Sequence, residues 1–392
     1  MNVRSVDHRA QDAKGANVIR KIAVFLPDLR PGGAERMRLQ MTREWLERGI
    51  AVEFVLCEAQ GELLAQLPKG ATVVDLRAAR VRSSLLPLMR YLRHGRPGAL
   101  VAAMWPLTVI APLAARLTCF GGTVVVSEHE PLGIAYAGQG DLHRLGLRAS
   151  MALGYRLADV RIGVSSGVAE HMAKLASMPR DKVHVVHNPA ASREGRTGQR
   201  RLGPMADVQG LLILTVGTLK RVKRHDVLLD AFARIAPATD ATLCILGEGQ
   251  ERGELEAQVC RLGLQGRVLV PGYASDPTPW YAHADLFVLS SDYEGFGNVI
   301  VEALEHSVPV VSTDCPSGPR EILEDGKYGT LVPVGDADAL AQAMLASLRA
   351  THDHAALNAR ARDFAVDKVA DQYLDHLLPG WRDADARTEA CD

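Results

Sequence analysis

The hydrophobic positions of this chain fall into short, nearly uninterrupted apolar runs that alternate with longer segments of helical periodicity. A short aliphatic and β-branched run bounded by turn residues is typical of a strand that is buried on both faces of a parallel sheet. The longer segments repeat their apolar positions at helical spacing. Strands are expected at residues 21–27, 51–56, 71–76, 99–104, 123–129, 160–165, 182–187, 211–217, 241–247, 267–272, 285–290, 308–313 and 329–334.

This alternation predicts an α/β fold built from βαβ units around parallel sheets. A polar, basic, glycine-rich segment divides the strands into two series and is expected to be a linker. We therefore expect two tandem Rossmann-like, doubly wound domains that face a central cleft, since ligands of such sheets bind beyond the carboxyl ends of the strands. The expected divisions are a flexible N-terminal tail, an N-terminal domain, a linker, a C-terminal domain and a C-terminal tail, at residues 1–19, 20–189, 190–208, 209–375 and 376–392.

One uncharged stretch, Gly98–Ala115, is long enough to raise the question of a membrane-spanning helix. It contains Pro106 and Pro112, and Arg116 follows it. A buried strand followed by a buried helix explains the same pattern. The polar residues 1–18 lack the apolar segment of a signal peptide.

Formal charge changes sign where the linker is expected. Residues 1–205 hold 29 Lys and Arg against 17 Asp and Glu, a balance of +12, and the remainder of the chain balances to −13. A basic half joined to an acidic half indicates that one face meets an anionic partner, although two differently charged domains without functional asymmetry would show the same split. The six scattered cysteines lack the spacing of a zinc site or a disulfide scaffold, which favours a reducing cytosol.

Two loops between a strand and a helix suggest an anion site. In PDLRPGGAER, Gly32 and Gly33 precede a helix, so the backbone and the helix N-terminus can approach a ligand closely. This loop lacks the GxGxxG spacing of a dinucleotide fold, which disfavours a nicotinamide cofactor. In VGTLKRVKRHD the strand ends at Gly217. Phosphate oxygens would relieve the repulsion among the cations that follow, which are Lys220, Arg221, Lys223 and Arg224.

A third loop, DYEGFGNVIVEA, places carboxylates on both sides of a glycine-rich break. Glu294 comes at the exit of a strand, and Glu302 lies inside the next helix, which Gly297 or Asn298 can cap. Carboxylates accept hydrogen bonds from hydroxyl groups. Cations for phosphates and carboxylates for hydroxyls in one cleft describe a site for a nucleotide sugar.

These loops, together with CPSGPREIL at residues 315–323, resemble the retaining GT-B glycosyltransferases of glycosyltransferase family 4. The E-x7-E pattern of Glu294 and Glu302 is the most specific part of a resemblance that extends from Lys21 to Tyr373. The motifs look most like those of bacterial members that build surface polysaccharides, such as lipopolysaccharide or capsule, on a lipid carrier. The resemblance implies a UDP-hexose or UDP-N-acetylhexosamine donor, a lipid-linked or glycan acceptor, and neither a metal nor another cofactor. It also implies that the N-terminal domain binds the acceptor and the C-terminal domain binds the donor.

The resemblance also implies roles for single residues. Gly33 would approach the donor diphosphate, which Lys223 would neutralise. Glu302 would hold the ribose hydroxyls, and Glu294 would contact hydroxyls of the donor sugar. His129, in VVSEHEP, falls where the family often has a sugar-contacting histidine, although a core or surface histidine would show the same sequence pattern. The other donor-binding candidates are Gly217, Arg221, Gly297 and Asn298.

This chain departs from the family pattern at Thr218, where the family usually has an arginine. Arg221 or Lys220 would then supply the second cation. Asn188, in VVHNP, matches a position that is expected to be a structural turn. Two Asp-x-Asp strings, at residues 336–338 and 383–385, stand at a helix start and in the tail and are not expected to bind metal.

A sugar leaving a diphosphate builds negative charge on the phosphate, which fixed cations and N–H groups stabilise. Retention can arise by double displacement or by front-face attack, and the sequence leaves both open. The alternatives to a transferase are a sugar-nucleotide epimerase of the same architecture and a non-catalytic sensor.

We expect a cytoplasmic protein that contacts the inner face of the anionic membrane, since Leu76–Arg96 places six arginines among apolar residues. An ordinary surface helix would also explain that segment, and no nucleic-acid partner is expected.

Overall fold

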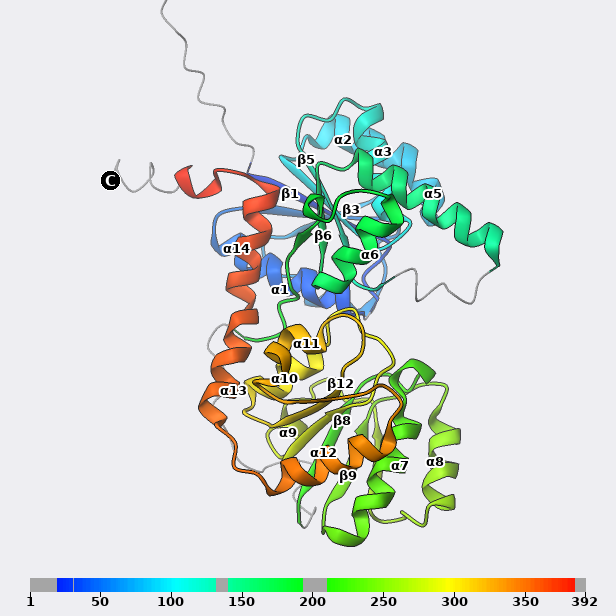
Figure 1. Cartoon of the computed structure of the whole chain (residues 1–392). Helices are drawn as coiled ribbons and strands as arrows, with labels where there is room; N and C mark the ends of the chain where they lie inside the picture. The colour runs from blue at the N-terminus through cyan, green and yellow to red at the C-terminus, as the bar shows by residue number, and fades with distance from the viewer. Residues whose placement is uncertain (1–19, 31, 132–139, 193–209, 385–392) are drawn as a thin grey trace, which may run out of the picture.

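A computed structural model of the chain describes residues 20–30, 32–131, 140–192 and 210–384. They form two lobes, one above the other, each built around a parallel sheet (Figure 1). Each strand expected from the sequence is present, and the two tandem Rossmann-like domains are confirmed.

The first sheet has the order β3-β2-β1-β4-β5-β6-β7, and its strands pair in parallel. The central strand β1 is almost entirely buried because helices cover both faces of the sheet (Figure 1). The strands are β1 (Lys21–Leu26), β2 (Ala51–Leu56), β3 (Thr72–Asp75), β4 (Ala99–Ala103), β5 (Thr123–Glu128), β6 (Val160–Gly163) and β7 (His184–Val185). The helices are α1 (Gly33–Glu47), α2 (Leu85–Gly95), α3 (Leu107–Leu117), α5 (Asp141–Leu157) and α6 (Ser166–Ala176).

The second sheet has the order β10-β9-β8-β11-β12-β13 and is also parallel. In both sheets the strand order reverses beside the first strand, where loops diverge and open a crevice at the carboxyl edge. The strands are β8 (Leu212–Val216), β9 (Thr242–Leu246), β10 (Val268–Gly272), β11 (Leu286–Leu289), β12 (Val310–Thr313) and β13 (Thr330–Val332). The helices are α7 (His225–Ile235), α8 (Arg252–Arg261), α9 (Thr278–Tyr281), α10 (Asn298–Glu305), α11 (Pro319–Ile322), α12 (Ala337–Arg349) and α13 (His354–Ala361).

The last long helix, α14 (Val366–Leu377), returns the chain to the first lobe and runs beside α1 (Figure 1). The indole nitrogen of Trp45 donates to the carbonyl of Ala370 at 3.1 Å. The apolar face of α14 completes the core of the first lobe. Residues 366–375, which the sequence assigned to the second domain, therefore pack on the first.

Residues 376–384 continue this packing, although the sequence assigned them to a tail. Trp381 is only 6% exposed and joins the first-lobe core. Its indole nitrogen donates to Asp375 at 2.8 Å. The N-terminal tail, most of the expected linker and residues 385–392 lie outside the described residues.

The uncharged stretch Gly98–Ala115 forms β4 and most of α3, both largely buried in the first lobe. Within the described ranges, no helix is long and apolar enough to cross a membrane. The interpretation of this stretch as a buried strand followed by a buried helix is therefore confirmed.

Candidate active site

The carboxyl edges of the two sheets face a cleft that holds two adjoining cavities. The larger cavity, of about 730 Å³, lies between α1 and the loops that follow β8, β9 and β10. The smaller cavity, of about 490 Å³, lies between the start of α1, the ends of β4 and β5, and residues 294–299. Val299, on α10, lines both cavities, so they meet near the N-terminus of this helix.

Most of the residues singled out from the sequence line these cavities. Gly217 and Glu302 line the larger cavity. The smaller cavity is lined by Gly33, His129, Lys223, Glu294, Gly297 and Asn298.

Arg221 is the exception. It is exposed, and it is not among the described residues that line either cavity. Arg221 and Lys223 belong to one short 3₁₀ turn, in which residues two apart point to different sides, so Lys223 faces the cleft and Arg221 faces solvent. Lys220 is also exposed.

Lys223 and Glu294 form an ion pair in the smaller cavity. Lys223 Nζ donates to Glu294 Oε1 at 2.7 Å, and the two side chains are 23% and 11% exposed. The hydroxyl of Ser291 donates to the same oxygen at 2.6 Å. The backbones also connect, since the amide of Asp292 donates to the carbonyl of Val222 at 2.8 Å. These bonds fix both loops, so the cation and the carboxylate are held in place before any ligand enters.

His129 stands at the end of β5, on the opposite wall of the smaller cavity. Burial and then the positive charge of Arg38 lower the pKa of His129 to about 3. The fully buried Arg38 donates to Ser127 Oγ at 2.6 Å, and this oxygen lies 3.2 Å from His129 Nε2. Because Arg38 uses the oxygen as an acceptor, the hydroxyl proton of Ser127 is available to His129 Nε2. Because its pKa is about 3, the imidazole of His129 is neutral at physiological pH.

The loop that carries Glu294 passes directly against His129. A Cβ atom at Gly295 would overlap the carbonyl oxygen of His129, so no side chain larger than hydrogen fits there. A second contact joins the lobes, since Asn188 Nδ2 donates to Asn298 Oδ1 at 2.9 Å. Asn188, expected to be a structural turn, also lines the smaller cavity.

Glu128 is a buried carboxyl group that sequence reasoning did not single out. It lines the smaller cavity and is 1% exposed. Its Oε1 accepts from the hydroxyls of Thr108 at 2.8 Å and Tyr155 at 3.0 Å. Burial raises the pKa of Glu128 to about 7, although these two hydrogen bonds favour the charged form. Its place next to His129 at a strand end was the signal that could have identified it.

The start of α1 presents its free amides to the smaller cavity. Gly33 is exposed, and a Cβ built on it would meet nothing within 4 Å, so the backbone there is open to a ligand. Glu35, in the first turn, lines the same cavity, and burial raises its pKa. On the facing lobe Gly297 precedes α10 with φ at +101°, a left-handed conformation that favours glycine. Two helix N-termini therefore point toward the junction of the cavities.

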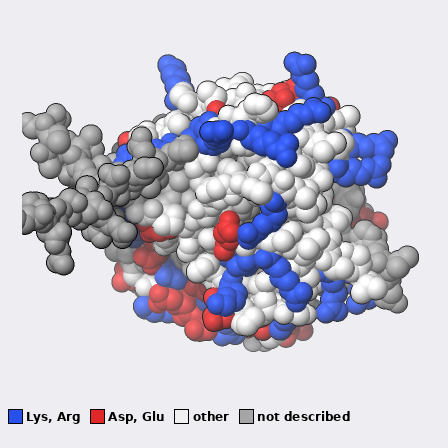
Figure 2. All heavy atoms as spheres, turned by 90° about the horizontal axis from the view of Figure 1, so that it is seen from above, with Lys and Arg blue, Asp and Glu red and all other residues white. Residues whose placement is uncertain are grey.

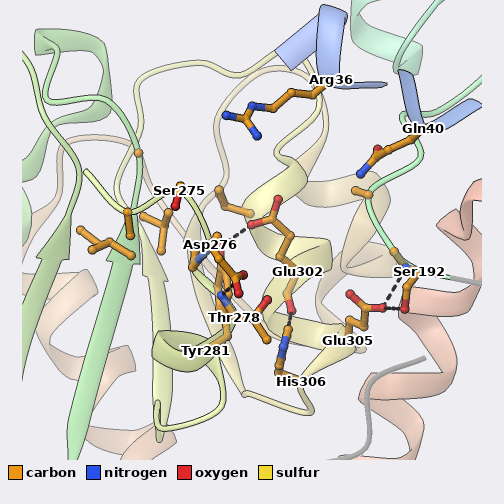
Figure 3. A pocket seen from close by; sticks show the side chains of 18 of the residues that line it. Arg36, Gln40, Ser192, Ser275, Asp276, Thr278, Tyr281, Glu302, Glu305 and His306 are labelled. Atoms are coloured by element: carbon orange, nitrogen blue, oxygen red, sulfur yellow. Dashed lines mark hydrogen bonds between the residues drawn. The ribbon is translucent and has the colours of Figure 1, made fainter. Parts of the chain in front are cut away.

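Glu302 projects from α10 into the larger cavity (Figure 3). The buried Tyr281 donates its hydroxyl to Glu302 Oε2 at 2.7 Å. Burial and the negative charge of Glu302 raise the pKa of Tyr281 well above its ordinary value. The tyrosine therefore remains a donor and fixes the carboxylate.

The loop after β10 supplies wall residues that the sequence did not reveal. Tyr273, Ser275 and Asp276 of this loop line the larger cavity, as does Thr278 at the start of α9. The signal was available, because this loop follows a predicted strand, and strand ends in such sheets form ligand sites.

Two Rossmann-like sheets that face each other across such a cleft are the architecture of the GT-B fold. The chain belongs to glycosyltransferase family 4. Residues 31–191 match the model described as Glycosyltransferase Family 4, and residues 210–350 match the one described as Glycosyl transferases group 1.

Several proteins are similar to this chain. It is 32% identical, over 68% of its length and 72% of the relative, to an enzyme of Campylobacter jejuni, N-acetylgalactosamine-N,N'-diacetylbacillosaminyl-diphospho-undecaprenol 4-alpha-N-acetylgalactosaminyltransferase. It is 28% identical, over 88% of its length and 96% of the relative, to the lipopolysaccharide core biosynthesis glycosyltransferase LpsE of Rhizobium meliloti. The crystal structure of Anabaena HepE in complex with UDP and glucose superposes with a TM-score of 0.74 at 22% identity, covering 91% of this chain and 99% of HepE.

Proposed function

We propose that this protein transfers a hexosyl or N-acetylhexosaminyl group from a UDP-sugar to a lipid-linked or polysaccharide acceptor in cell-surface glycan synthesis. The anomeric configuration is retained, and no metal ion takes part. The observation that carries the proposal is the junction of the two cavities, where the Lys223–Glu294 pair lies beside the N-terminus of α10. A complex of the similarly folded HepE with UDP and glucose supports the choice of donor.

In this proposal the nucleotide occupies the larger cavity and the donor sugar occupies the smaller one. Glu302, fixed by Tyr281, accepts hydrogen bonds from the ribose hydroxyls. Lys223 and the amides around Gly33 and Asn298 surround the diphosphate. Glu294 accepts from a hydroxyl of the donor sugar.

The chemistry follows from where charge develops. As the glycosidic bond breaks, negative charge grows on the leaving phosphate and positive charge on the sugar. Lys223 and the two helix N-termini stabilise the phosphate, and because Glu294 already holds Lys223, little reorganisation is needed. A neutral His129 can hydrogen-bond a sugar hydroxyl without repelling the cationic ring. The configuration of the product, measured by NMR, tests retention.

The aspartates of the first Asp-x-Asp string have other roles. Asp336 caps α12 by accepting from the amide of Ala339 at 2.9 Å. Asp338 pairs with Arg234 at 2.7 Å. Asp385, which ends the second string, lies outside the described residues. These contacts support a mechanism without metal, and full transfer activity in excess EDTA is the expected result.

The acceptor is proposed to be presented at a membrane surface. The name of the Campylobacter relative specifies a diphospho-undecaprenol acceptor. Lys and Arg side chains are spread over the end of the first lobe, while Asp and Glu gather mainly along one edge of that view (Figure 2). The six arginines between residues 76 and 96 are all exposed, and Leu86 among them is 63% exposed. This surface, which we call the α2 surface, is proposed to contact the anionic inner face of the cytoplasmic membrane.

A panel of UDP- and GDP-sugars, incubated with and without a polyprenyl diphosphate-linked glycan, tests the function. The expected result is release of UDP that depends on the acceptor. Isomerised donor without an acceptor would indicate an epimerase instead, and binding without turnover of any donor would indicate a sensor. Tighter binding of GDP than UDP would overturn the choice of nucleotide.

A further inference from the structure

The walls of the larger cavity carry an uneven distribution of charge. Among the described residues that line it, the Lys and Arg side chains are Arg36 and Arg43, and both belong to α1 of the first lobe. The first lobe also contributes Glu44, but this carboxylate pairs with Arg48 at 2.9 Å. Among Asp, Glu, Lys and Arg, the second lobe contributes only carboxylates to the described lining, which are Glu248, Asp276, Glu302 and Glu305. In this cavity, the cationic side chains that could neutralise a diphosphate therefore lie on the first-lobe wall.

Arg36 lines the larger cavity and follows directly after the residues of α1 that line the smaller one. It lies in the first turn of α1, and its amide donates to the carbonyl of Gly32 at 3.1 Å. Arg36 shares one face of the helix with Gln40, and both side chains line the larger cavity (Figure 3). Arg43 lies two turns further along the helix, about 10 Å from Arg36. Arg36 is thus the nearer of the two cations to the open backbone at Gly33.

The side chain of Arg36 crosses the cleft. Its Nη2 donates to the phenolic oxygen of Tyr273 at 3.0 Å, in the loop after β10 of the second lobe. This contact is exposed, and its acceptor is neutral, whereas an arginine bonds phosphate oxygens by stronger, charge-assisted hydrogen bonds. A diphosphate between the lobes can therefore replace Tyr273 as the partner of Arg36.

We infer that Arg36 is the second cation for the donor diphosphate and acts from the first lobe, where Lys223 acts from the second. The inference rests on the proposed function. Thr218, in the wall of the same cavity, carries no charge, and Arg221 and Lys220 face solvent. Because the two cations belong to different lobes, the diphosphate binds tightly only when both lobes face it, and donor binding stabilises their juxtaposition.

Isothermal titration calorimetry of the full chain with UDP and with uridine tests this assignment. Arg36→Met should weaken UDP binding about 10- to 100-fold, as expected for a lost charge-assisted hydrogen bond. Uridine affinity should change less than about twofold, because uridine has no phosphate. Arg36→Lys should recover part of the loss, and UDP binding should depend less on salt in Arg36→Met than in the unaltered protein.

Two further variants separate the alternatives. Arg221→Met removes the same charge from the second-lobe turn and should leave UDP affinity within about twofold. Tyr273→Phe removes only the hydroxyl partner and should preserve the preference for UDP over uridine. Equal UDP affinity in Arg36→Met and the unaltered protein, or equal losses for UDP and uridine, would overturn the role of Arg36. Of the results of this titration, only failure of the unaltered protein to bind UDP would overturn the proposed function as well.

Discussion

Lys223 Nζ lies 2.7 Å from Glu294 Oε1, although 71 positions of sequence separate the two residues. They meet because β8 and β11 are neighbours in the second sheet, so the loops that follow these strands leave the same edge side by side. The pair places a cation for a phosphate and an acceptor for a sugar hydroxyl in one cavity. Each partner also holds the other in position.

Removing either partner should abolish most transfer. Lys223→Ala and Glu294→Ala are each expected to lower the turnover rate by about 10²–10³, the usual effect of losing one preorganised electrostatic group. Release of UDP from a donor sugar in the presence of acceptor measures the rate. Lys220→Ala removes an exposed lysine of the same loop and serves as the control. Unchanged turnover in Lys223→Ala would place the diphosphate elsewhere.

Glu302→Gln should act mainly on nucleotide affinity. The amide still accepts a hydrogen bond from Tyr281, so the local geometry survives, but the charged acceptor for the ribose is lost. We expect UDP to bind about 10-fold more weakly, with a smaller effect on turnover at saturating donor. Calorimetry and steady-state kinetics separate the two effects. A lower turnover with unchanged UDP affinity would contradict a ribose contact.

Ser127 should set the tautomer of His129. Its oxygen accepts from Arg38, and we expect its proton to be directed to His129 Nε2, which would leave the proton of the imidazole on Nδ1. Nitrogen-15 NMR of labelled histidine should show this tautomer and no protonation between pH 5 and pH 9, given a pKa of about 3. Ser127→Ala should produce a mixture of tautomers and lower turnover while UDP affinity stays constant. A dominant Nε2–H form in the unaltered protein would refute this arrangement.

Glu128 should make stability depend on pH. Its pKa is about 7 in the fold against an ordinary value of 4.5, so the fold favours the protonated form. This contribution to stability is complete below pH 4.5 and disappears as the pH rises through 7. Glu128→Gln, which cannot ionise, should therefore gain stability relative to the unaltered protein between pH 5 and pH 8, by up to about 3 kcal/mol. Urea unfolding of both proteins at the two pH values measures the difference, and a constant difference would contradict the shifted pKa.

The α2 surface should bind anionic membranes reversibly. Each arginine near such a surface contributes about 1 kcal/mol, and salt screens the attraction. Sedimentation with anionic liposomes should therefore recover the protein at low salt and release it at high salt. Arg90→Gln combined with Arg93→Gln should weaken binding. The matched control, Arg261→Gln with Arg349→Gln, removes two exposed arginines of the second lobe. Equal binding to neutral and anionic liposomes would exclude the electrostatic explanation.

Most of the fold could be predicted from the sequence because the signals are local. Buried parallel strands are nearly continuous apolar runs, and the helices between them show the helical spacing of apolar residues within a short stretch of sequence. The candidate residues at strand ends could be found for the same reason, since the carboxyl edge of a parallel sheet is where loops such as DYEGFGN form sites. Arg221 was misplaced because a count of charges in a turn does not tell which of them faces the cleft.

The sequence alone determined two parallel α/β domains, three loops rich in glycine and charge, and the pair of glutamates around a glycine break, because each depends on residues close together in the chain. Only the tertiary structure decided which groups meet. It brought Arg36 to Tyr273 across the cleft, placed Glu128 in a buried wall of the site, and returned α14 to the first lobe. Such contacts depend on how the elements of the two lobes pack together. The periodicity of a sequence shows which residues are apolar, but it does not show which remote segments come into contact.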